Sequence, residues 1–263
     1  MPSFRKIVWA YYRKFGRHDL PWRKTRNPYR ILVSEVMLQQ TQVERVIPFY
    51  KKFITQFPTQ KQLAAAPLSE VLKCWQGLGY NRRAKQLRAV AQALTKKKFH
   101  TIEELEELPG VGPYTARAVA AFAYDQDVVF VETNIRTVVI HHFFPNRKKV
   151  SDTEIEKILA NVLPKGKSRD WYSALMDYGA YLKRSGISHN ARGTTYAKQS
   201  KFTGSLREAR GAILRMLAES DVSRARLVNL FGTTRRAQVL AALTALCTEG
   251  LVRVSGNRYT LAD

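Results

Sequence analysis

The stretch LPGVGPYTARAVA, from Leu108 to Ala120, is the most specific local signal in the sequence. Its two glycines permit a tight turn that leaves backbone amides exposed at the start of a helix. Those amides and the positive end of the helix dipole favour a phosphate group. We therefore expect Gly110, Val111 and Gly112 to contact a phosphate backbone. The alternative is a plain glycine-containing turn between two helices.

The composition of the whole chain points to a polyanionic partner. The 263 residues include 44 Lys and Arg but 21 Asp and Glu, which gives a formal net charge of +23. With 45% hydrophobic residues the chain can still build a core, so the charge decorates a folded protein. No stretch approaches the roughly 18 consecutive apolar residues of a membrane span, and the first residues do not read as a signal peptide. Nucleic acid is the favoured partner.

Cysteine usage bounds the compartment and the metal chemistry. Cys74 and Cys247 are the two cysteines of the chain, too few for a disulfide framework or a four-thiolate site. We expect no bound metal and a reducing, cytoplasmic location, associated with the nucleoid if the source is prokaryotic.

Apolar residues recur at three- and four-residue spacing almost throughout, which predicts an all-α fold with extended runs near 128–131 and at the C-terminal end. The periodicity fails over the basic, irregular residues 183–202, so we place a boundary between domains 1–199 and 204–263. The second domain should hold helices near 205–219, 223–230 and 234–249, followed by a hairpin turning at 255–257. This order resembles a winged helix. Residues 200–263 hold 10 basic and 5 acidic residues, so the main nucleic-acid surface belongs to the first domain.

Three further segments extend the signal of residues 108–120. They are LPWRKTRNPYRILVSEVMLQQTQVERVIPFY (Leu20 to Tyr50), CWQGLGYNRRAKQL (Cys74 to Leu87) and VVFVETNIRTVV (Val128 to Val139). Together they resemble the MutY-type adenine DNA glycosylases, within the helix-hairpin-helix glycosylase superfamily that includes endonuclease III. The resemblance covers about residues 3 to 182, and SEVMLQQTQ is specific to the MutY branch. It implies a two-lobed fold in which residues of about 28–133 form a six-helix lobe and the termini form the second.

Glu35 lies in a strongly apolar helix, Ile31 to Leu38. A carboxyl there either makes a buried structural hydrogen bond or has a raised pKa that suits an acid. The resemblance implies the second role, in which Glu35 protonates the departing base and then helps to activate water.

A second carboxylate should stabilise the positive charge that develops on the sugar. The resemblance places it at Glu132, where the family normally has Asp. Glu132 can do the work of the Asp from a slightly retracted backbone, can alter or weaken the activity, or can cap the next helix. Asn134 matches a family Asn that orients this carboxylate and the sugar, and its alternative is a helix N-cap.

Tyr114 stands where bifunctional relatives carry a Lys that forms a Schiff base with the sugar. Without that amine, covalent lyase catalysis lacks its nucleophile, so we expect a monofunctional enzyme. The alternative for Tyr114 is an ordinary exposed hairpin tyrosine.

Base flipping also needs side chains that fill the vacated space. The resemblance implies that Gln39 and Gln40 probe the duplex, and that Leu78 and Tyr80 intercalate beside the estranged base. Arg82, Arg83 and Lys85 would then follow the DNA backbone. The alternative is that Leu78 belongs to the core and Tyr80 anchors a loop. Family members commonly have GLGYY where this chain has Tyr80-Asn81, so stacking on the opposite base is expected to differ there.

Two features depart from the family. The four cysteine ligands of its iron–sulfur cluster become Lys183, Asn190, Gly193 and Gln199, so we expect no cluster and no cofactor. The NUDIX-like reader of 8-oxoguanine is replaced by the winged-helix-like residues 204–263, whose Arg235 and Arg236 can contact DNA or form a solvated helix face. That domain can equally bind a protein.

These features predict a monomeric DNA glycosylase of base excision repair that acts on duplex DNA with a lesion or mismatch and leaves an abasic site. Adenine opposite 8-oxoguanine is the favoured substrate. The alternatives are oxidised or deaminated pyrimidines, such as 5-hydroxyuracil, uracil or mismatched thymine, and a non-catalytic lesion-binding protein.

Overall fold

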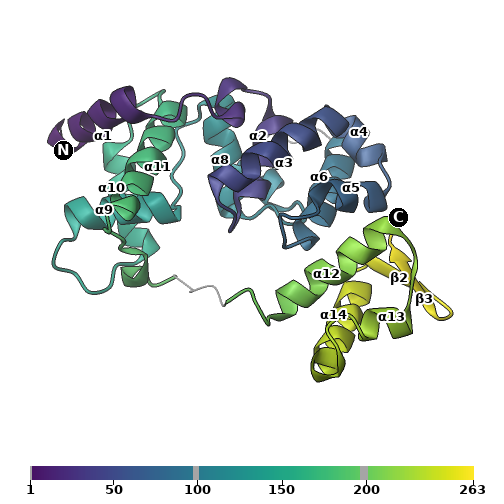
Figure 1. Ribbon diagram of the computed structural model, residues 1–263. Coiled ribbons are helices and arrows are strands. Elements are labelled where there is room, and N and C mark those ends of the chain that lie inside the picture. The colour runs from purple at the N-terminus through teal and green to yellow at the C-terminus, as the bar shows by residue number, and fades with distance from the viewer. Residues whose placement is uncertain (1, 97–100, 196–200) are drawn as a thin grey trace. The chain divides into compact units, whose positions relative to one another are not determined.

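A computed structural model describes residues 2–96, 101–195 and 201–263, and in these ranges the chain is mainly helical with one small sheet (Figure 1). Position Gln199 and the predicted boundary at residue 199 lie outside the described residues. The helices are α1 (Pro2–Phe15), α2 (Pro28–Leu38), α3 (Val43–Gln56), α4 (Gln60–Ala65), α5 (Leu68–Trp75), α6 (Arg82–Lys96), α7 (Ile102–Glu106), α8 (Pro113–Tyr124), α9 (Thr133–Phe143), α10 (Asp152–Val162), α11 (Ser168–Arg184), α12 (Leu206–Glu219), α13 (Arg224–Val228) and α14 (Arg236–Thr248). Short 3-10 turns cover Pro21–Lys24, Asn190–Arg192 and Thr233–Arg235, and the strands are β1 (Val222–Ser223), β2 (Val252–Ser255) and β3 (Arg258–Leu261).

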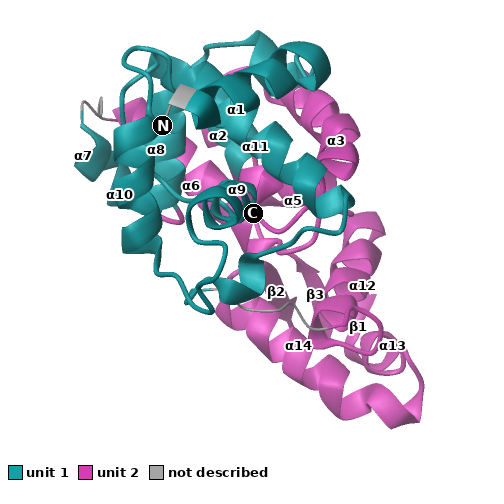
Figure 2. Cartoon of the chain, turned by 90° about the vertical axis from the view of Figure 1, so that its left-hand side faces the viewer, with its two compact units in different colours: residues 1–35, 100–107, 111–198 teal, residues 36–99, 108–110, 199–263 magenta. Residues whose placement is uncertain are grey.

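The chain forms two compact units, each built from separated segments (Figure 2). Unit 1 comprises residues 1–35, 100–107 and 111–198, and unit 2 comprises residues 36–99, 108–110 and 199–263. The C-terminal residues thus group with residues 36–99. The division into 1–199 and 204–263 describes the chain as sequence modules, and it stays a prediction.

The core of unit 1 is aromatic. Phe130 and Tyr172 stack with ring centroids 4.0 Å apart, and Phe4 of α1 meets Trp171 of α11 edge to face at 5.9 Å. Such pairs add about 0.5–1.5 kcal/mol to the stabilisation that burial of their area supplies. Residues 128–131, predicted to be extended, form no strand and instead place Phe130 in this core.

The C-terminal part of unit 2 has the predicted order of three helices and a hairpin. β2 and β3 pair antiparallel, and the partners Ser255 and Arg258 enclose a two-residue turn. The two-residue strand β1 adds to β3 and completes a three-stranded sheet of order β1-β3-β2, which the sequence did not signal.

The C-terminal part is bound to α5 and α6 by polar contacts. Lys85 of α6 donates to the Glu249 carbonyl at 2.6 Å, and Ser69 of α5 donates to Asp263 at 2.7 Å. Within unit 2, residues 204–263 therefore pack on the helices that flank residues 76–81.

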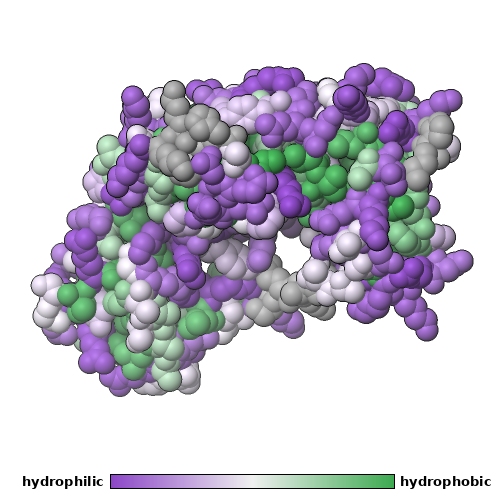
Figure 3. Space-filling model, turned by 180° about the vertical axis from the view of Figure 1, so that it is seen from behind, coloured by the Kyte–Doolittle hydropathy of each residue, from purple (hydrophilic) through white to green (hydrophobic). Residues whose placement is uncertain are grey.

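Hydrophilic residues cover most of the face shown in Figure 3. Within the described ranges, no helix combines the length and the apolar character that crossing a membrane requires.

Candidate active site

Glu35 is the buried carboxyl group of α2, with 5% of its surface exposed. Its neighbours along the helix, Ile31, Ser34 and Val36, are also buried. Burial, reinforced by the charge of Glu132, raises the pKa of Glu35 to about 7, while the Tyr114 hydrogen bond and Arg23 act in the opposite direction. The carboxyl can therefore hold a proton near neutral pH and release it to a bound group.

Tyr114, in the first turn of α8, holds this carboxyl in place. Its hydroxyl donates to Glu35 Oε2 at 2.9 Å, and its ring packs edge to face on Phe130 with centroids 5.6 Å apart. Burial and the nearby Glu35 charge raise the pKa of Tyr114 well above its ordinary range. The phenol thus stays a neutral donor, and the alternative of an ordinary exposed hairpin tyrosine is wrong.

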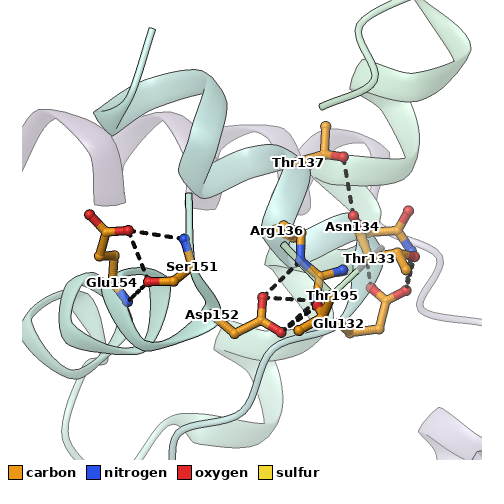
Figure 4. Close-up of polar contacts among 9 residues, drawn as sticks. All are labelled: Glu132, Thr133, Asn134, Arg136, Thr137, Ser151, Asp152, Glu154 and Thr195. Carbon is orange, nitrogen blue, oxygen red and sulfur yellow. Dashed lines mark hydrogen bonds and ion pairs between the residues drawn. The ribbon is translucent and has the colours of Figure 1, made fainter. Parts of the chain in front are cut away.

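Glu132 is the N-cap of α9 (Figure 4). Its Oε2 accepts from the Asn134 backbone N–H at 2.7 Å, and its Oε1 accepts from the Thr133 hydroxyl at 2.6 Å and from Asn134 Nδ2 at 3.2 Å. The helix-cap alternative is thus realised in the geometry, and a cap fixed by three donors is also a well-oriented carboxylate. Asn134 orients the carboxylate and is not itself the N-cap.

Lys183, at the end of α11, extends this group. Its ammonium donates to Thr133 Oγ1 at 3.2 Å, and Thr133 in turn donates to Glu132. Burial lowers the pKa of Lys183, whereas the Glu132 charge raises it. Sequence reasoning assigned Lys183 to a lost ligand position and missed this contact, because α11 and α9 are far apart in the chain.

The two glycines of the turn before α8 have different roles. Gly110 has φ +81°, and a Cβ built there would lie 2.6 Å from the Gln86 side chain. Gly112 is the N-cap of α8 with φ −88°, and a Cβ there would have no protein atom within 4 Å. Val111 between them is buried. Gly110 is therefore required by the turn itself, whereas Gly112 leaves open space above the helix N-terminus.

The structure corrects the expectation for Arg83. Its guanidinium is buried and donates to the carbonyls of Val36 (2.7 Å), Met37 (3.1 Å) and Gln39 (2.6 Å). These are carbonyls of the last turn of α2 and the residue after it, which need donors from outside the helix. Burial lowers the pKa of Arg83 to about 10. Arg83 thus organises the protein backbone, while its neighbour Arg82 is exposed.

Residues 77–80 form a loop with a fixed backbone. Arg45 donates to the Gly77 carbonyl, and the Trp75 indole (3.1 Å) and Arg83 (3.2 Å) donate to the Gly79 carbonyl. Leu78 is buried, the position that the core alternative predicts for it. Asn81, where relatives have a second tyrosine, is buried as well.

Among the described residues, three non-glycine residues adopt a positive φ: Gln40 (56°), Tyr80 (47°) and Asp125 (57°). Asp125 ends α8 in the left-handed conformation that is common after helices. Gln40 and Tyr80 are two of the residues predicted to meet DNA, and strained backbone of this kind clusters at functional sites. Gln40 is exposed, and Gln39 and Tyr80 are half-buried.

The predicted residues therefore fall into two groups. Glu35, Tyr114, Glu132 and Asn134 interact in unit 1. The residues predicted to probe the duplex lie in unit 2, where Arg83 joins the end of α2 to the loop at residues 77–80.

The HhH-GPD superfamily of base excision DNA repair proteins matches residues 33–165, a range that contains all four residues of the first group. The chain belongs to this superfamily. It is 37% identical to the adenine DNA glycosylase of Mycolicibacterium smegmatis, over 94% of this chain and 92% of that protein. It is 36% identical to the adenine DNA glycosylase of Mycobacterium tuberculosis, over 96% of this chain and 91% of the relative. The structure of a thermostable thymine-DNA glycosylase aligns with a TM-score of 0.58 and 28% identity, over 68% of this chain and 87% of that one.

The residues at the family's cluster positions do not fit an iron–sulfur cluster. Lys183 and Asn190 offer an ammonium and a carboxamide, and Gly193 offers no side chain, where thiolates are the required ligands. A Cβ at Gly193 would lie 2.5 Å from Arg136 Cδ. Within the described ranges, no group of three or more His, Cys, Asp or Glu residues is arranged to hold a metal.

Polar contacts anchor the segment that follows α11 (Figure 4). Arg136 of α9 forms a bidentate ion pair with Asp152 at 2.9 Å. The Thr195 hydroxyl accepts from Arg136 at 3.0 Å and donates to Asp152 at 2.8 Å. Backbone hydrogen bonds link Val150 to Arg192 and Thr194. The segment after α11 is thereby attached to α9, the helix whose N-terminus is capped by Glu132.

Proposed function

We propose that this HhH-GPD protein is a monofunctional adenine DNA glycosylase that acts on adenine opposite 8-oxoguanine. The observation that carries the proposal is the buried Glu35 carboxyl, with a pKa of about 7, held by Tyr114 within reach of the Glu132 charge. Two relatives named adenine DNA glycosylase align with this chain over nine-tenths of their length, which supports adenine as the base.

In the proposed reaction, protonated Glu35 donates its proton to a ring nitrogen of the flipped adenine. The bond between the sugar and the base breaks, and its electron pair leaves with the base. Glu132, fixed by Thr133 and Asn134, stabilises the positive charge left on the sugar. Glu35, now a carboxylate, takes a proton from the water that attacks the sugar, and the product is an abasic site.

DNA contacts are assigned by the same proposal. The turn at Gly110, Val111 and Gly112 binds a phosphate, Gln39, Gln40 and Tyr80 probe the duplex, and Arg82 follows the backbone. Arg83 acts by holding these probing residues in place. The protein works as a monomer, without a cofactor, in the compartment that holds the DNA.

Base release under single-turnover conditions tests the proposal. Duplexes carry adenine opposite 8-oxoguanine or guanine, and 5-hydroxyuracil, uracil or thymine opposite guanine. We expect release of adenine, strand cleavage only after alkali, and loss of release in Glu35→Gln. Glu44→Gln, a change at an exposed carboxyl of α3, is the matched control and should retain the wild-type rate.

The second candidate is excision of a pyrimidine, which the likeness to the thymine-DNA glycosylase structure favours. Release of thymine or uracil without release of adenine would establish it. Strand cleavage without alkali would overturn the monofunctional assignment and make the Lys183 amine the first candidate nucleophile. Tight binding to these duplexes without base release would overturn both proposed activities and establish a lesion-binding protein.

A further inference from the structure

Arg207, in the first turn of α12, contacts Tyr80 of the loop at residues 77–80. Its Nη1 donates to the Tyr80 hydroxyl at 3.0 Å, and its guanidinium carbon lies 5.6 Å from the centre of the Tyr80 ring. Both side chains are half-buried, and both residues belong to unit 2. A residue of the C-terminal part thus touches a residue that the proposed function places against DNA.

This contact acts on the part of Tyr80 that the backbone does not fix. The carbonyls of Gly77 and Gly79 are held by Arg45, Trp75 and Arg83, so the loop backbone is set before DNA arrives. The torsions of the Tyr80 side chain depend on its side-chain contacts. A hydrogen bond from Arg207 at the hydroxyl, together with Arg83 5.5 Å from the ring centre, restricts them.

The placement of Arg207 depends on the docking of residues 204–263. Arg210, one turn further along α12, pairs with Glu249 at 2.6 and 2.9 Å, and the Glu249 carbonyl accepts from Lys85 of α6. The α12 helix is therefore tied to the same helix, α6, that begins two residues after Tyr80.

We propose that Arg207 is a positioning residue that orients Tyr80 for its contact with the base opposite the excised one. The C-terminal part thereby takes part in discriminating 8-oxoguanine from guanine in that strand. This inference rests on the proposed function, because it takes Tyr80 to be the residue that meets the opposite base. A ring that is oriented in advance loses less conformational freedom on stacking, and a shift of that ring changes discrimination more than it changes the chemistry at Glu35.

The test is a double-mutant cycle of Arg207→Ala and Tyr80→Phe, the second of which removes the hydroxyl and keeps the ring. The primary readout is the ratio of dissociation constants for duplexes with adenine opposite 8-oxoguanine and opposite guanine. It is measured in the Glu35→Gln background, so that binding is read without turnover. The second readout is the ratio of base-release rates on the same duplexes, measured with Glu35 intact. Arg215→Ala removes an exposed arginine from the same helix and is the matched control.

We expect each single variant to reduce the binding ratio about three- to tenfold, the effect of one lost hydrogen bond. The double variant should lose no more than Arg207→Ala alone, since Tyr80→Phe removes a hydrogen bond that Arg207→Ala has already removed. The midpoint of thermal unfolding of each variant should equal that of the control Arg215→Ala. A ratio for Arg207→Ala that matches Arg215→Ala, or effects of the two variants that add, would overturn the inference. A wild-type protein that releases no base would defeat the proposed function alone, because the binding ratio is measured independently.

Discussion

The Tyr114 hydroxyl and Glu35 Oε2 lie 2.9 Å apart in a hydrogen bond that joins the first turn of α8 to α2. Tyr114 follows Gly112 by two residues, so the same turn that offers backbone amides to a phosphate also holds the acid. Any movement of this turn when DNA binds is therefore transmitted to the Glu35 carboxyl through the Tyr114 hydrogen bond.

Replacement of Tyr114 by Phe removes the donor and keeps the ring. Because that hydrogen bond lowers the pKa of Glu35, we expect the pKa to rise above about 7. The alkaline fall of the base-release rate should then move to higher pH, and the maximal rate should fall because the carboxyl is less well oriented. Rates from pH 5.5 to 9 measure both effects. Tyr124→Phe, at the exposed end of α8, is the control, and an alkaline limb that coincides with it would contradict this role.

Glu35→Gln should stabilise the protein above neutral pH while abolishing base release. The folded pKa of Glu35 is about 7 and its ordinary value is 4.5, so the native state binds the proton more tightly than the unfolded state does. Stability from this group is complete below pH 4.5 and is lost as the pH rises through 7, by up to about 3 kcal/mol. Urea unfolding at pH 5 and pH 8 measures it. A wild-type protein whose free energy of unfolding falls no more than that of Glu35→Gln between these values would disprove the assignment.

The two substitutions Glu132→Gln and Glu132→Asp separate a catalytic charge from a helix cap. Gln keeps the length and removes the charge, and we expect base release to slow by about a hundredfold or more. Asp keeps the charge and is a good N-cap, so its rate should fall less and α9 should stay intact. Single-turnover rates and helical circular dichroism measure the two effects. A Glu132→Gln variant with the wild-type rate of base release would show that Glu132 acts only as the helix cap.

Gly110→Ala and Gly112→Ala should fail in different ways. At Gly110 the positive φ and the close Gln86 side chain should destabilise the fold by about 1–2 kcal/mol. At Gly112 neither obstacle exists, so the variant should fold normally but bind duplex DNA more weakly, because its methyl group occupies the space above the helix N-terminus. Thermal unfolding and duplex binding of the pair test this. Equal unfolding midpoints for the two variants would refute the distinction.

The sequence predicted the helical fold, the hairpin before α8 and the grouping of Glu35 with Tyr114 and Glu132. The helices and the hairpin follow from local patterns, such as apolar periodicity and glycines before a helix. The grouping of Glu35 with Tyr114 and Glu132 came from the resemblance to the MutY-type glycosylases. The two-residue strand β1 is too short to leave such a pattern, and it exists because β3 offers it a partner.

The roles of the arginines and of Lys183 could not be predicted in the same way. Arg82 and Arg83 look alike in the sequence, yet one is exposed and the other is buried against the end of α2. Which of them turns inward depends on where carbonyls without helical partners lie, and that is decided by packing. Lys183 and Arg207 reach residues 50 and 127 positions away, at distances for which sequence spacing carries no signal.

The packing of α1 on α11 also sets a timetable for synthesis. Phe4 leaves the ribosome long before Trp171, and at typical elongation rates the delay is roughly ten to thirty seconds. During that interval α1 lacks α11, and its Phe4 can pack only on segments made earlier, such as Phe143 of α9, whose ring centre lies 4.9 Å from that of Phe4. Unit 1 is therefore complete only after α11 has been made and has packed on α1, a helix synthesised more than 150 residues earlier.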